Sequence, residues 1–502
     1  MDKKVLCVYG SSDIVSLQKE YDLKKTYLVF LEDDQQEYEA NKSLADQDSI
    51  YIYFIDSIVR LEPILKEIAW KFLFLEIKLQ VSSSNKETKR KEFEEIQKAF
   101  DLIVDGVFLS ASDYSDFGLT TIFNIYRNLF QVSSFHTLKG ISQKFLQKPA
   151  IICGAGPSLN EAIPFLKKLD NQALIFAGGA ALEVLKKENI TPHITACLDK
   201  YAENIETFKN VPTFFSWKIP PKNLSYPSSL KVLCSTNSSY LFDKWIEEKL
   251  GLSFDTIDMG WTVTTFMTSL ALYLGCGPII FVGCDLCFND KKMYADHVKK
   301  EHFNKKLEKD HITCLNKNKE TVRTQKDWLM ASFWFQNTVK KHKSTQFFNT
   351  SRNGLSLGER VQDFSLEHLL DGPSFDFKKE INSLFLDLPL HEPNVEQMYH
   401  YIYDEISNEL EFINKRLETM QSMFDKQEYR FSENWRQSWS YQYILFPLWE
   451  MMKYLYIRNI KQDNLFSFTL ELYKTLYFKD VLEKHKKLVE KFNARTEISN
   501  TK

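Results

Sequence analysis

Short apolar runs alternate with helical patterns along the N-terminal part of the chain. Residues 5–9, 27–31 and 50–54 each form a continuous apolar run of the kind found in buried parallel strands, and residues 101–109, DLIVDGVFL, are predicted as another strand. Residues 61–79 carry apolar side chains at helical spacing instead. This alternation predicts a small α/β domain over residues 1–135.

The alternation becomes more regular after a largely helical connector at residues 117–146. Helices are predicted at residues 180–188 and 262–274. Strands are predicted at residues 150–153, 173–177, 194–198, 213–216, 232–234, 279–282 and 346–349. Strands that alternate with helices in this way favour a mostly parallel, Rossmann-like sheet. We assign it to a central domain of residues 136–374.

The character of the chain changes again near residue 375. No glycine follows Gly372, and aromatic and charged residues recur at helical spacing. Residues 375–502 are therefore expected to form an all-helical domain. Its tryptophans, among them Trp435, Trp439 and Trp449, favour a helix–helix core over a groove that binds a partner.

Composition narrows the class of protein further. The chain has 502 residues, of which 44% are hydrophobic and 26% charged, and its net charge of -3 gives no general reason to bind nucleic acid. No apolar stretch reaches the roughly 18 uncharged residues of a membrane span, and no signal peptide is recognised. The eight cysteines lie mostly inside apolar runs, and Cys284 and Cys287 have no second pair. We expect buried, reduced thiols and a cytoplasmic protein.

The clearest candidate site is the glycine loop between the strand at residues 150–153 and the helix after it. The loop reads Gly154-Ala155-Gly156-Pro157-Ser158. Glycine lets a backbone approach a ligand closely, and a helix N-terminus attracts anions. We expect the Ser158 side chain to cap the helix and the loop to hold a phosphate. The loop lacks the Lys-Ser/Thr pair of a Walker loop, and Leu159 replaces the third glycine of a dinucleotide fingerprint.

Other polar residues follow the strands of the same predicted sheet. Because ligands of open α/β sheets bind beyond the carboxyl ends of the strands, these residues are expected to converge. Asp199 is ambiguous, since it could cap a helix, orient a ribose hydroxyl or bind a metal. The same ambiguity holds for Asp285. The residues that follow the strands and are expected to converge are Gly178, Asp199, Ser235, Asn237, Gly283 and Asp285.

The segment after Asp285 is rich in groups that transfer protons. Tyr294 and His297 occupy a predicted loop near the strand end, and His297 is a candidate base, with an exposed histidine of no function as the alternative. His302 and His311 are weaker candidates. None of these residues has the spacing of metal ligands, so no metal site is predicted from them.

Four segments of the central region resemble a known family in order and spacing. They are ICGAGPSLNE, FAGGAALEVLKKENITPHITACLDKY, GWTVTTFMTSLALYLGCGPIIFVGCDLCFNDKKMYADH and FFNTSRNGLSLG. Together they resemble the central domain of the motility accessory factors, which are linked to the transfer of nonulosonic, sialic-acid-like sugars to Ser or Thr of flagellins. The domain is also similar to the 6-hydroxymethylpterin diphosphokinase-like family and to a bacterial sialyltransferase fold.

This resemblance implies roles for the residues above. Gly154, Gly156, Pro157 and Ser158 would hold the donor phosphate. The nucleotide would be lined by Gly178, Asp199, Ser235 and Asn237. Gly283, Asp285 and Tyr294 would lie near the sugar, with Asp285, Tyr294 and His297 as the catalytic candidates. Two departures are visible, because Ala155 stands where the sialyltransferases carry Asn and no His falls at the position of their base.

Three functions are consistent with these observations. The first is a glycosyltransferase that moves a nonulosonic sugar from a CMP-activated donor to a protein such as flagellin or another surface protein, without a cofactor. The second is a diphosphokinase in which Asp199 and Asp285 hold magnesium against the phosphates of ATP. The third is a non-catalytic nucleotide-binding partner protein.

Overall fold

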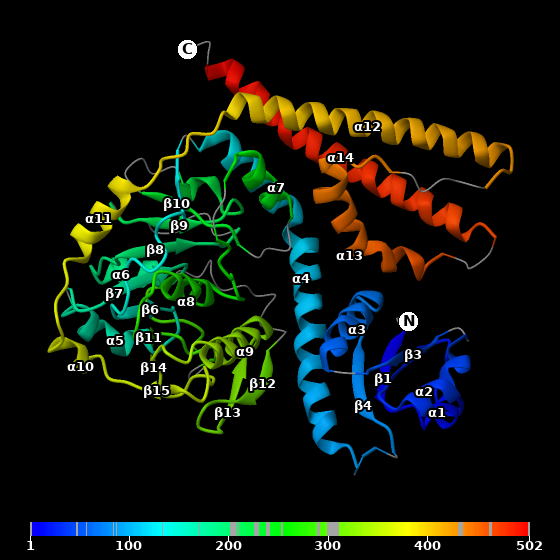
Figure 1. Cartoon of the computed structure of the whole chain (residues 1–502), viewed down its shortest axis with the longest axis horizontal. Coiled ribbons are helices and arrows are strands. Elements are labelled where there is room, and N and C mark those ends of the chain that lie inside the picture. Colours follow the sequence, from blue (N-terminus) through cyan, green and yellow to red (C-terminus); the bar gives the residue numbers. More distant parts are fainter. Residues whose placement is uncertain are drawn as a thin grey trace. The chain divides into compact units, whose positions relative to one another are not determined.

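The structure is a computed structural model, and the part of the chain that it describes excludes several short segments. The described residues are 3–46, 49–56, 58–83, 85–86, 88–132, 134–169, 171–200, 208, 210–224, 230–236, 241–252, 255–288, 292–298, 311–429, 435–460 and 464–499. Figure 1 gives the course of the chain. No helix in these ranges is long and apolar enough to cross a membrane.

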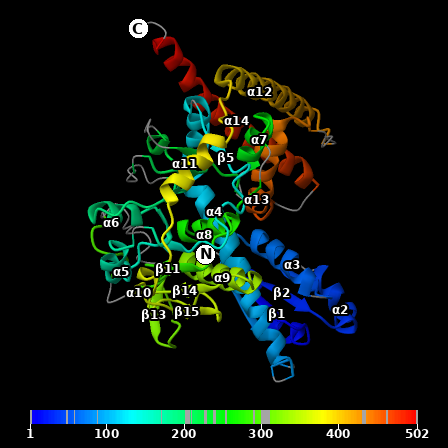
Figure 2. The ribbon, with the colours of Figure 1, turned by 60° about the vertical axis from the view of Figure 1, so that its left-hand side comes forward.

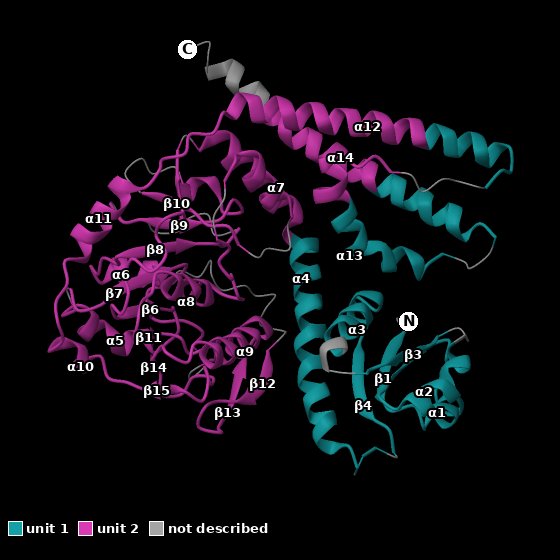
Figure 3. Ribbon diagram, in the orientation of Figure 1, with its two compact units in different colours: residues 1–116, 417–434, 446–477 teal, residues 117–416, 435–445, 478–502 magenta. Residues whose placement is uncertain are grey.

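The described chain divides into two compact units (Figure 3). The first unit contains residues 1–116, 417–434 and 446–477, and the second contains residues 117–416, 435–445 and 478–502. The unit boundaries fall inside the long helices α4 (Arg90–Gln131), α12 (Val395–Asp425) and α14 (Phe466–Ser499). The three-domain division by residue number stays a prediction.

The first unit is built on a four-stranded parallel sheet. Its strand order is β3 (Ile50–Phe54), β2 (Thr26–Glu32), β1 (Lys4–Tyr9) and β4 (Ile77–Val81). Three short helices connect the strands, namely α1 (Ile14–Glu20), α2 (Gln35–Asn41) and α3 (Ile58–Lys71). Apolar clusters that include strand residues such as Val29 and Phe30 form the core of this unit. The predicted N-terminal α/β fold is confirmed.

Two predicted elements of this unit are wrong. Residues 101–109, predicted as a strand, lie inside helix α4. Phe100, Val107 and Ala111 are buried at helical spacing there, so the apolar run is one stripe of a long helix. The helical pattern predicted for residues 61–79 ends with α3 at Lys71, and β4 follows, because the apolar residues near its end alternate instead.

The second unit is built on a nine-stranded sheet in which every pair of neighbours is parallel. The strand order begins with β15 (Val361–Asp363), β14 (Phe347–Asn349), β11 (Ile279–Val282) and β6 (Ala150–Cys153). It continues with β7 (Leu174–Gly178), β8 (Ile194–Cys197), β9 (Thr213–Phe215), β10 (Lys231–Leu233) and β5 (His136–Thr137). All seven strands predicted for the central region are present, and β5 and β15 were not predicted.

Helices cover both faces of this sheet. The first connections are α5 (Leu159–Leu166) and α6 (Ala181–Lys187), which lie on one side of the strands in Figure 2. On the other side lie α8 (Val263–Tyr273) and α9 (Lys326–Lys341), with α8 packed against β6, β7 and β8. The antiparallel hairpin β12 (Ile312–Leu315) and β13 (Thr321–Thr324) precedes α9 and was not predicted.

The topology places a switch point between β6 and β11. From β6 the chain adds β7, β8, β9 and β10 in one direction, and it then returns to β11 on the other side of β6. Ligands of open α/β sheets bind at such a point, outside the carboxyl ends of the strands. The loops that follow β6 and β11 are therefore the expected walls of a site.

Helices form the rest of the described chain after residue 375. These helices are α11 (Phe377–Asp387), α12, α13 (Phe446–Ile457) and α14, whereas α7 (Leu241–Lys249) and the short α10 (Glu367–Leu370) come before residue 375. A π-helical turn, Tyr441–Leu445, precedes α13. Trp435 stacks on Tyr441 and meets Phe478 edge to face, so it is part of a helix–helix core. The helical nature of this region is confirmed.

Candidate functional site

The glycine loop after β6 is held in close contact with the loop after β11. The N–H of Gly154 donates to the carbonyl of Val282 at 2.7 Å, and the N–H of Gly156 donates to the carbonyl of Gly283 at 2.8 Å. A Cβ on Gly154 would lie 2.4 Å from the Gly283 carbonyl oxygen. Glycine is therefore required at position 154 for the packing of two backbones against each other.

Asp285 lies beneath this loop and holds it in place. One of its carboxylate oxygens, Oδ2, accepts the Ser158 N–H at 2.9 Å, and the other, Oδ1, accepts the hydroxyl of Ser351. The residue is 5% exposed. Its carboxylate thus takes the place that an external anion would occupy at the start of α5.

The Ser158 side chain does not cap α5, contrary to the prediction. The backbone of Ser158 is helical, with φ -67° and ψ -11°, whereas a capping residue normally has extended geometry. Its hydroxyl is buried without a hydrogen-bond partner in the described part of the chain. The Asp285 carboxylate accepts the N–H of Ser158 itself.

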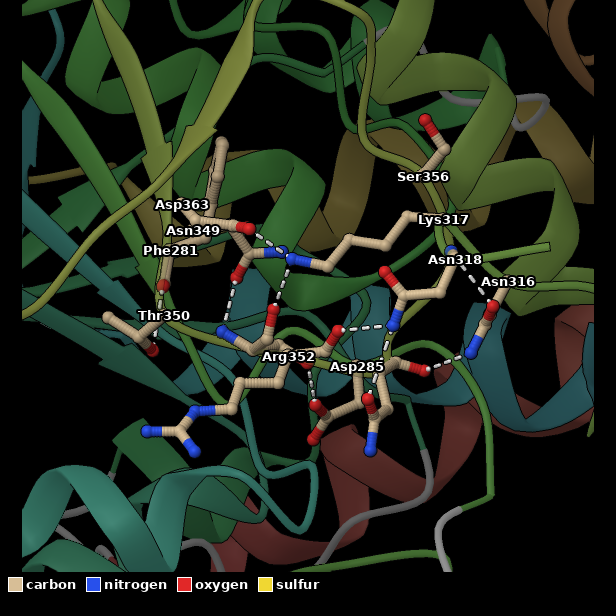
Figure 4. A network of polar contacts seen from close by, with 12 residues as sticks. Phe281, Asp285, Asn316, Lys317, Asn318, Asn349, Thr350, Arg352, Ser356 and Asp363 are labelled. Carbon is tan, nitrogen blue, oxygen red and sulfur yellow. Dashed lines mark hydrogen bonds and ion pairs between the residues drawn. The ribbon is translucent and has the colours of Figure 1, made fainter. Parts of the chain in front are cut away.

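A turn after β14 completes the support of Asp285 (Figure 4). The Asn349 side-chain oxygen accepts the Ser351 N–H at 3.0 Å, and Lys317 donates to the Ser351 carbonyl at 2.7 Å and pairs with Asp363. The carbonyl of Asp285 accepts the Leu355 N–H at 2.9 Å. The segment FFNTSRNG, quoted above for the family resemblance, therefore holds Asp285 in place through hydrogen bonds.

A pocket of about 240 Å³ opens above this support at the switch point. Glycine turns form one wall, and the start of α8 at Thr262, Val263 and Thr264 forms another. Acidic and aromatic side chains complete the lining. The lining residues are Gly154, Ala155, Gly156, Gly178, Gly179, Ala180, Asp199, Trp261, Thr262, Val263, Thr264, Gly283, Cys284, Leu286, Cys287, Met293, Tyr294, Asp327 and Trp328.

Six of the predicted site residues meet in this pocket, namely Gly154, Gly156, Gly178, Asp199, Gly283 and Tyr294. Tyr294 is brought there because the segment 292–298 docks on the glycine loop. The N–H of Ala295 donates to the Ala155 carbonyl at 2.8 Å, and the N–H of Asp296 donates to the Asn160 side chain at 3.1 Å.

The other predicted site residues lie elsewhere. Pro157, Ser158 and Asp285 belong to the supporting layer and are not in the lining. The hydroxyl of Ser235 donates to buried Glu247 at 2.7 Å. His297 is at the surface, with Nε2 3.4 Å from the carboxylate of Glu188. Asn237 lies outside the described residues.

Backbone N–H groups at two places could bind a phosphate. The helix α8 is properly capped, because the Thr262 hydroxyl accepts the Thr265 N–H and the Thr265 hydroxyl accepts the Thr262 N–H. Within the described ranges, no hydrogen bond engages the N–H groups of Val263 and Thr264 or those of Gly179 and Ala180. These four residues belong to the lining, whereas the N–H groups of Gly154, Gly156 and Ser158 in the glycine loop donate to the segment after β11 or its last strand residue.

The side chains of the pocket are acidic rather than basic. No Lys or Arg is among its described lining residues. Burial, followed by the carboxylate of Asp199, raises the pKa of Asp327 to about 6. Burial and then the charges of Asp327 and Asp199 raise the pKa of the Tyr294 phenol well above its usual range. All three of these acidic residues line the pocket.

The two cysteines of the lining are not suited to act as nucleophiles. Burial raises the pKa of both Cys284 and Cys287 to about 12, so both are thiols at neutral pH. All eight cysteines are free, and seven of them are buried, Cys314 being partly exposed. The expectation of buried, free thiols is confirmed for Cys284 and Cys287.

Sequence reasoning missed several residues of the pocket, chiefly Asp327, Trp328, Trp261 and Thr262. Asp327 lies in the first turn of α9. An Asp in a first turn is usually explained by the helix dipole, so it carries no functional signal by itself. The start of α8 could have been inferred, because a helix that returns the chain to a parallel sheet begins at the edge where the carboxyl ends of the strands lie.

The sheet order and the pocket define a doubly wound α/β protein with its site at the switch point. Residues 123–291 match the family model described as 6-hydroxymethylpterin diphosphokinase MptE-like. Among solved structures, the MAf glycosyltransferase from Magnetospirillum magneticum AMB-1 is similar, with a TM-score of 0.55 and 15% sequence identity. The alignment covers 98% of this chain and 80% of that one. No curated protein sequence matches the chain.

The comparisons confirm the resemblance found in the sequence. The central segment 123–291 is similar to the MptE-like family, and the chain has a fold similar to that of the MAf glycosyltransferase. The predicted fold class is confirmed with it.

Proposed function

We propose that the protein is a glycosyltransferase that takes its sugar from a nucleotide donor bound at the switch point. The observation that supports this most directly is the pocket itself. It combines glycine turns and a capped helix start with three acidic side chains in one space. Backbone donors suit a phosphate leaving group, and acidic groups suit the hydroxyls of a sugar and of an acceptor.

In its finer form the proposal names a CMP-activated nonulosonic sugar as donor and Ser or Thr of a flagellin or another surface protein as acceptor. CMP carries a single phosphate, so the N–H groups of Val263, Thr264, Gly179 and Ala180 can stabilise its charge. The glycine loop contributes the Ala155 backbone at the edge of the lining. The family resemblance supports the choice of sugar and acceptor. The expected requirement for no cofactor is part of this proposal.

The match to the MptE-like family favours a second candidate, a diphosphokinase that uses ATP and magnesium. Its magnesium would be held by Asp199 and Asp285. Asp199 lines the pocket, but both carboxylate oxygens of Asp285 are bound to Ser158 and Ser351 beneath it. The expected pair of carboxylates therefore does not converge on one ion, and we rank this function second.

A thermal-shift series on the full chain separates the two candidates. A ligand that binds only the native state raises the free energy of unfolding by about 2.7 kcal/mol when its concentration is a hundred times its dissociation constant. The melting temperature rises as a result. CMP is expected to raise the melting temperature more than AMP or ATP, with and without a chelator. A shift that requires ATP together with magnesium, and no shift with CMP, would reverse the ranking.

A further inference from the structure

Asp327 is the pocket carboxylate with no assigned role. It lies at the beginning of α9, immediately after the hairpin β12–β13. The hairpin is fixed beside the pocket, because the Thr324 hydroxyl donates to the Leu286 carbonyl at 2.6 Å and Leu286 is in the lining. Asp327 is partly exposed, and it lines the pocket together with its neighbour Trp328.

Two acidic groups from other segments line the same pocket as Asp327. Asp199 follows β8, and Tyr294 comes from the segment docked on the glycine loop. The charge of Asp327 acts on Tyr294, and the charge of Asp199 acts on both of the other groups. Tyr294 also lies against Trp328, with ring centroids 6.2 Å apart and planes at 78°. The three groups thus form an acidic cluster of Asp199, Tyr294 and Asp327, with no described Lys or Arg in the lining.

The other candidate bases are less suitable. His297 points to Glu188 at the surface and is not in the lining. Asp285 is buried, with both carboxylate oxygens engaged in hydrogen bonds. Cys284 and Cys287 are thiols, and the Tyr294 phenol keeps its proton because its pKa is raised.

Two carboxylates of the lining remain, those of Asp199 and Asp327. Oδ2 of Asp199 would lie 3.7 Å from a Cβ on Gly179, so Asp199 stands beside the turn whose N–H groups suit the phosphate. Asp327, at the start of α9, is therefore the carboxylate left for the acceptor, and its pKa is raised to about 6.

We propose that Asp327 is the catalytic residue that accepts the proton of the acceptor hydroxyl, and that Asp199 and Tyr294 are its positioning neighbours. The inference rests on the proposed glycosyl transfer. In that step the acceptor O–H loses its proton to the Asp327 carboxylate, and the acceptor oxygen bonds to the anomeric carbon. The bond from that carbon to the donor phosphate oxygen breaks, and its electron pair leaves with the nucleotide.

The test compares Asp327→Asn with His297→Ala in transfer from a CMP-nonulosonate to a Ser/Thr-rich flagellin acceptor. General base catalysis is worth on the order of 10²- to 10⁴-fold, so Asp327→Asn is expected to lower kcat by at least about 100-fold. CMP affinity, followed by tryptophan fluorescence of Trp261 and Trp328, should change by less than about threefold. His297→Ala should retain kcat within about threefold, because that side chain lies outside the pocket.

A second variant protects the test against a merely structural effect. In Asp327→Ala, added formate can take the missing carboxylate's place, so the rate should rise with formate concentration, and in Asp199→Ala it should not. An active wild type together with an active Asp327→Asn, or an Asp327→Ala that formate fails to rescue, would overturn the role of Asp327. A wild type that transfers no sugar from any CMP donor would overturn the proposed function, and this inference with it.

Discussion

The backbone N–H of Ser158 donates a hydrogen bond of 2.9 Å to the carboxylate of Asp285. This bond joins the loop after β6 to the loop after β11, which are the two sides of the switch point. A negatively charged side chain at the start of a helix is favourable, and here it also connects the walls of the pocket.

The first prediction concerns Asp285. Asp285→Ala leaves the Ser158 N–H and the Ser351 hydroxyl without their acceptor, and it should lower the free energy of unfolding by about 3 kcal/mol. Asp285→Asn keeps an acceptor oxygen and should cost less. Ser158→Ala is the matched control, because its hydroxyl has no partner in the described structure and the N–H is retained. Urea denaturation measures all three, and an Asp285→Ala variant as stable as Ser158→Ala would contradict the supporting role.

The second prediction concerns Gly156. A Cβ at this position would lie 2.3 Å from Oδ2 of Asp285 and 2.7 Å from the Gly283 carbonyl oxygen. Gly156→Val should therefore lower the melting temperature as well as block nucleotide binding, since the side chain would separate the two loops. The control is Gly251→Ala, where a Cβ meets nothing within 4 Å and only the positive φ of 67° is unfavourable. Full stability of Gly156→Val in a thermal melt would refute this packing.

The third prediction is a pH dependence of transfer. With the pKa of Asp327 raised to about 6, the base form is lost below that pH, so kcat/KM should fall as the pH drops through 6. Asp199→Asn removes one cause of the raised pKa of Asp327, so the fall in kcat/KM should occur at a lower pH than in the wild type. Because burial is the larger cause, the pKa should not return fully to its ordinary value. Asp296→Asn, at the surface, serves as control. Identical acid limbs in wild type and Asp199→Asn would rule out this coupling.

The fourth prediction concerns the buried carboxyl of Glu247, away from the pocket. Burial, and to a lesser extent Asp243, raises the pKa of Glu247 to about 7. Because the native state then binds this proton more tightly than the unfolded state, the contribution of Glu247 to stability declines as the pH rises from about 4.5 to 7. Glu247→Gln removes the buried charge and can still accept the hydrogen bond of Ser235.

Glu247→Gln should thus match the wild type near pH 4.5 and exceed its stability at pH 8 by up to about 3 kcal/mol. Glu248→Gln, one residue along the same helix and exposed, should show no such difference. Chemical denaturation at the two pH values decides the matter, and an equal effect of both variants would count against a buried charge at Glu247.

The sequence predicted the fold well where the local pattern decides the structure. Fully buried strands such as β6 and β11 are continuous apolar runs, so the sequence indicates both their presence and their length. The run at residues 101–109 shows the limit, because a stripe of a 42-residue helix looks the same in a short window. The two-residue β5 is too short to show a pattern, and β15, with the sequence Val-Gln-Asp, has only one apolar residue and no apolar run.

The candidate site was predictable only in part. The glycine turns and Asp199 follow directly from the strand ends, so their convergence could be inferred from parallel topology. The different roles of Asp285, which supports the loop, and Asp327, which lines the pocket, could not be inferred from the sequence. Both are acidic residues near element ends, and only the three-dimensional packing shows that one is bound beneath the loop and the other faces the pocket.

The parallel sheet has a consequence for how such a protein can diversify. Since every strand of the nine-stranded sheet points the same way, the segments beyond the ends of β6, β7, β8 and β11 meet at one edge of the sheet and line the pocket. The hairpin β12–β13 is inserted between β11 and α9, so it can be exchanged or lengthened without altering the order of the strands. Grafting this hairpin from a relative would alter what approaches the pocket beside Leu286 while leaving the glycine turns and the start of α8 in place, so access to the pocket can change independently of the sheet.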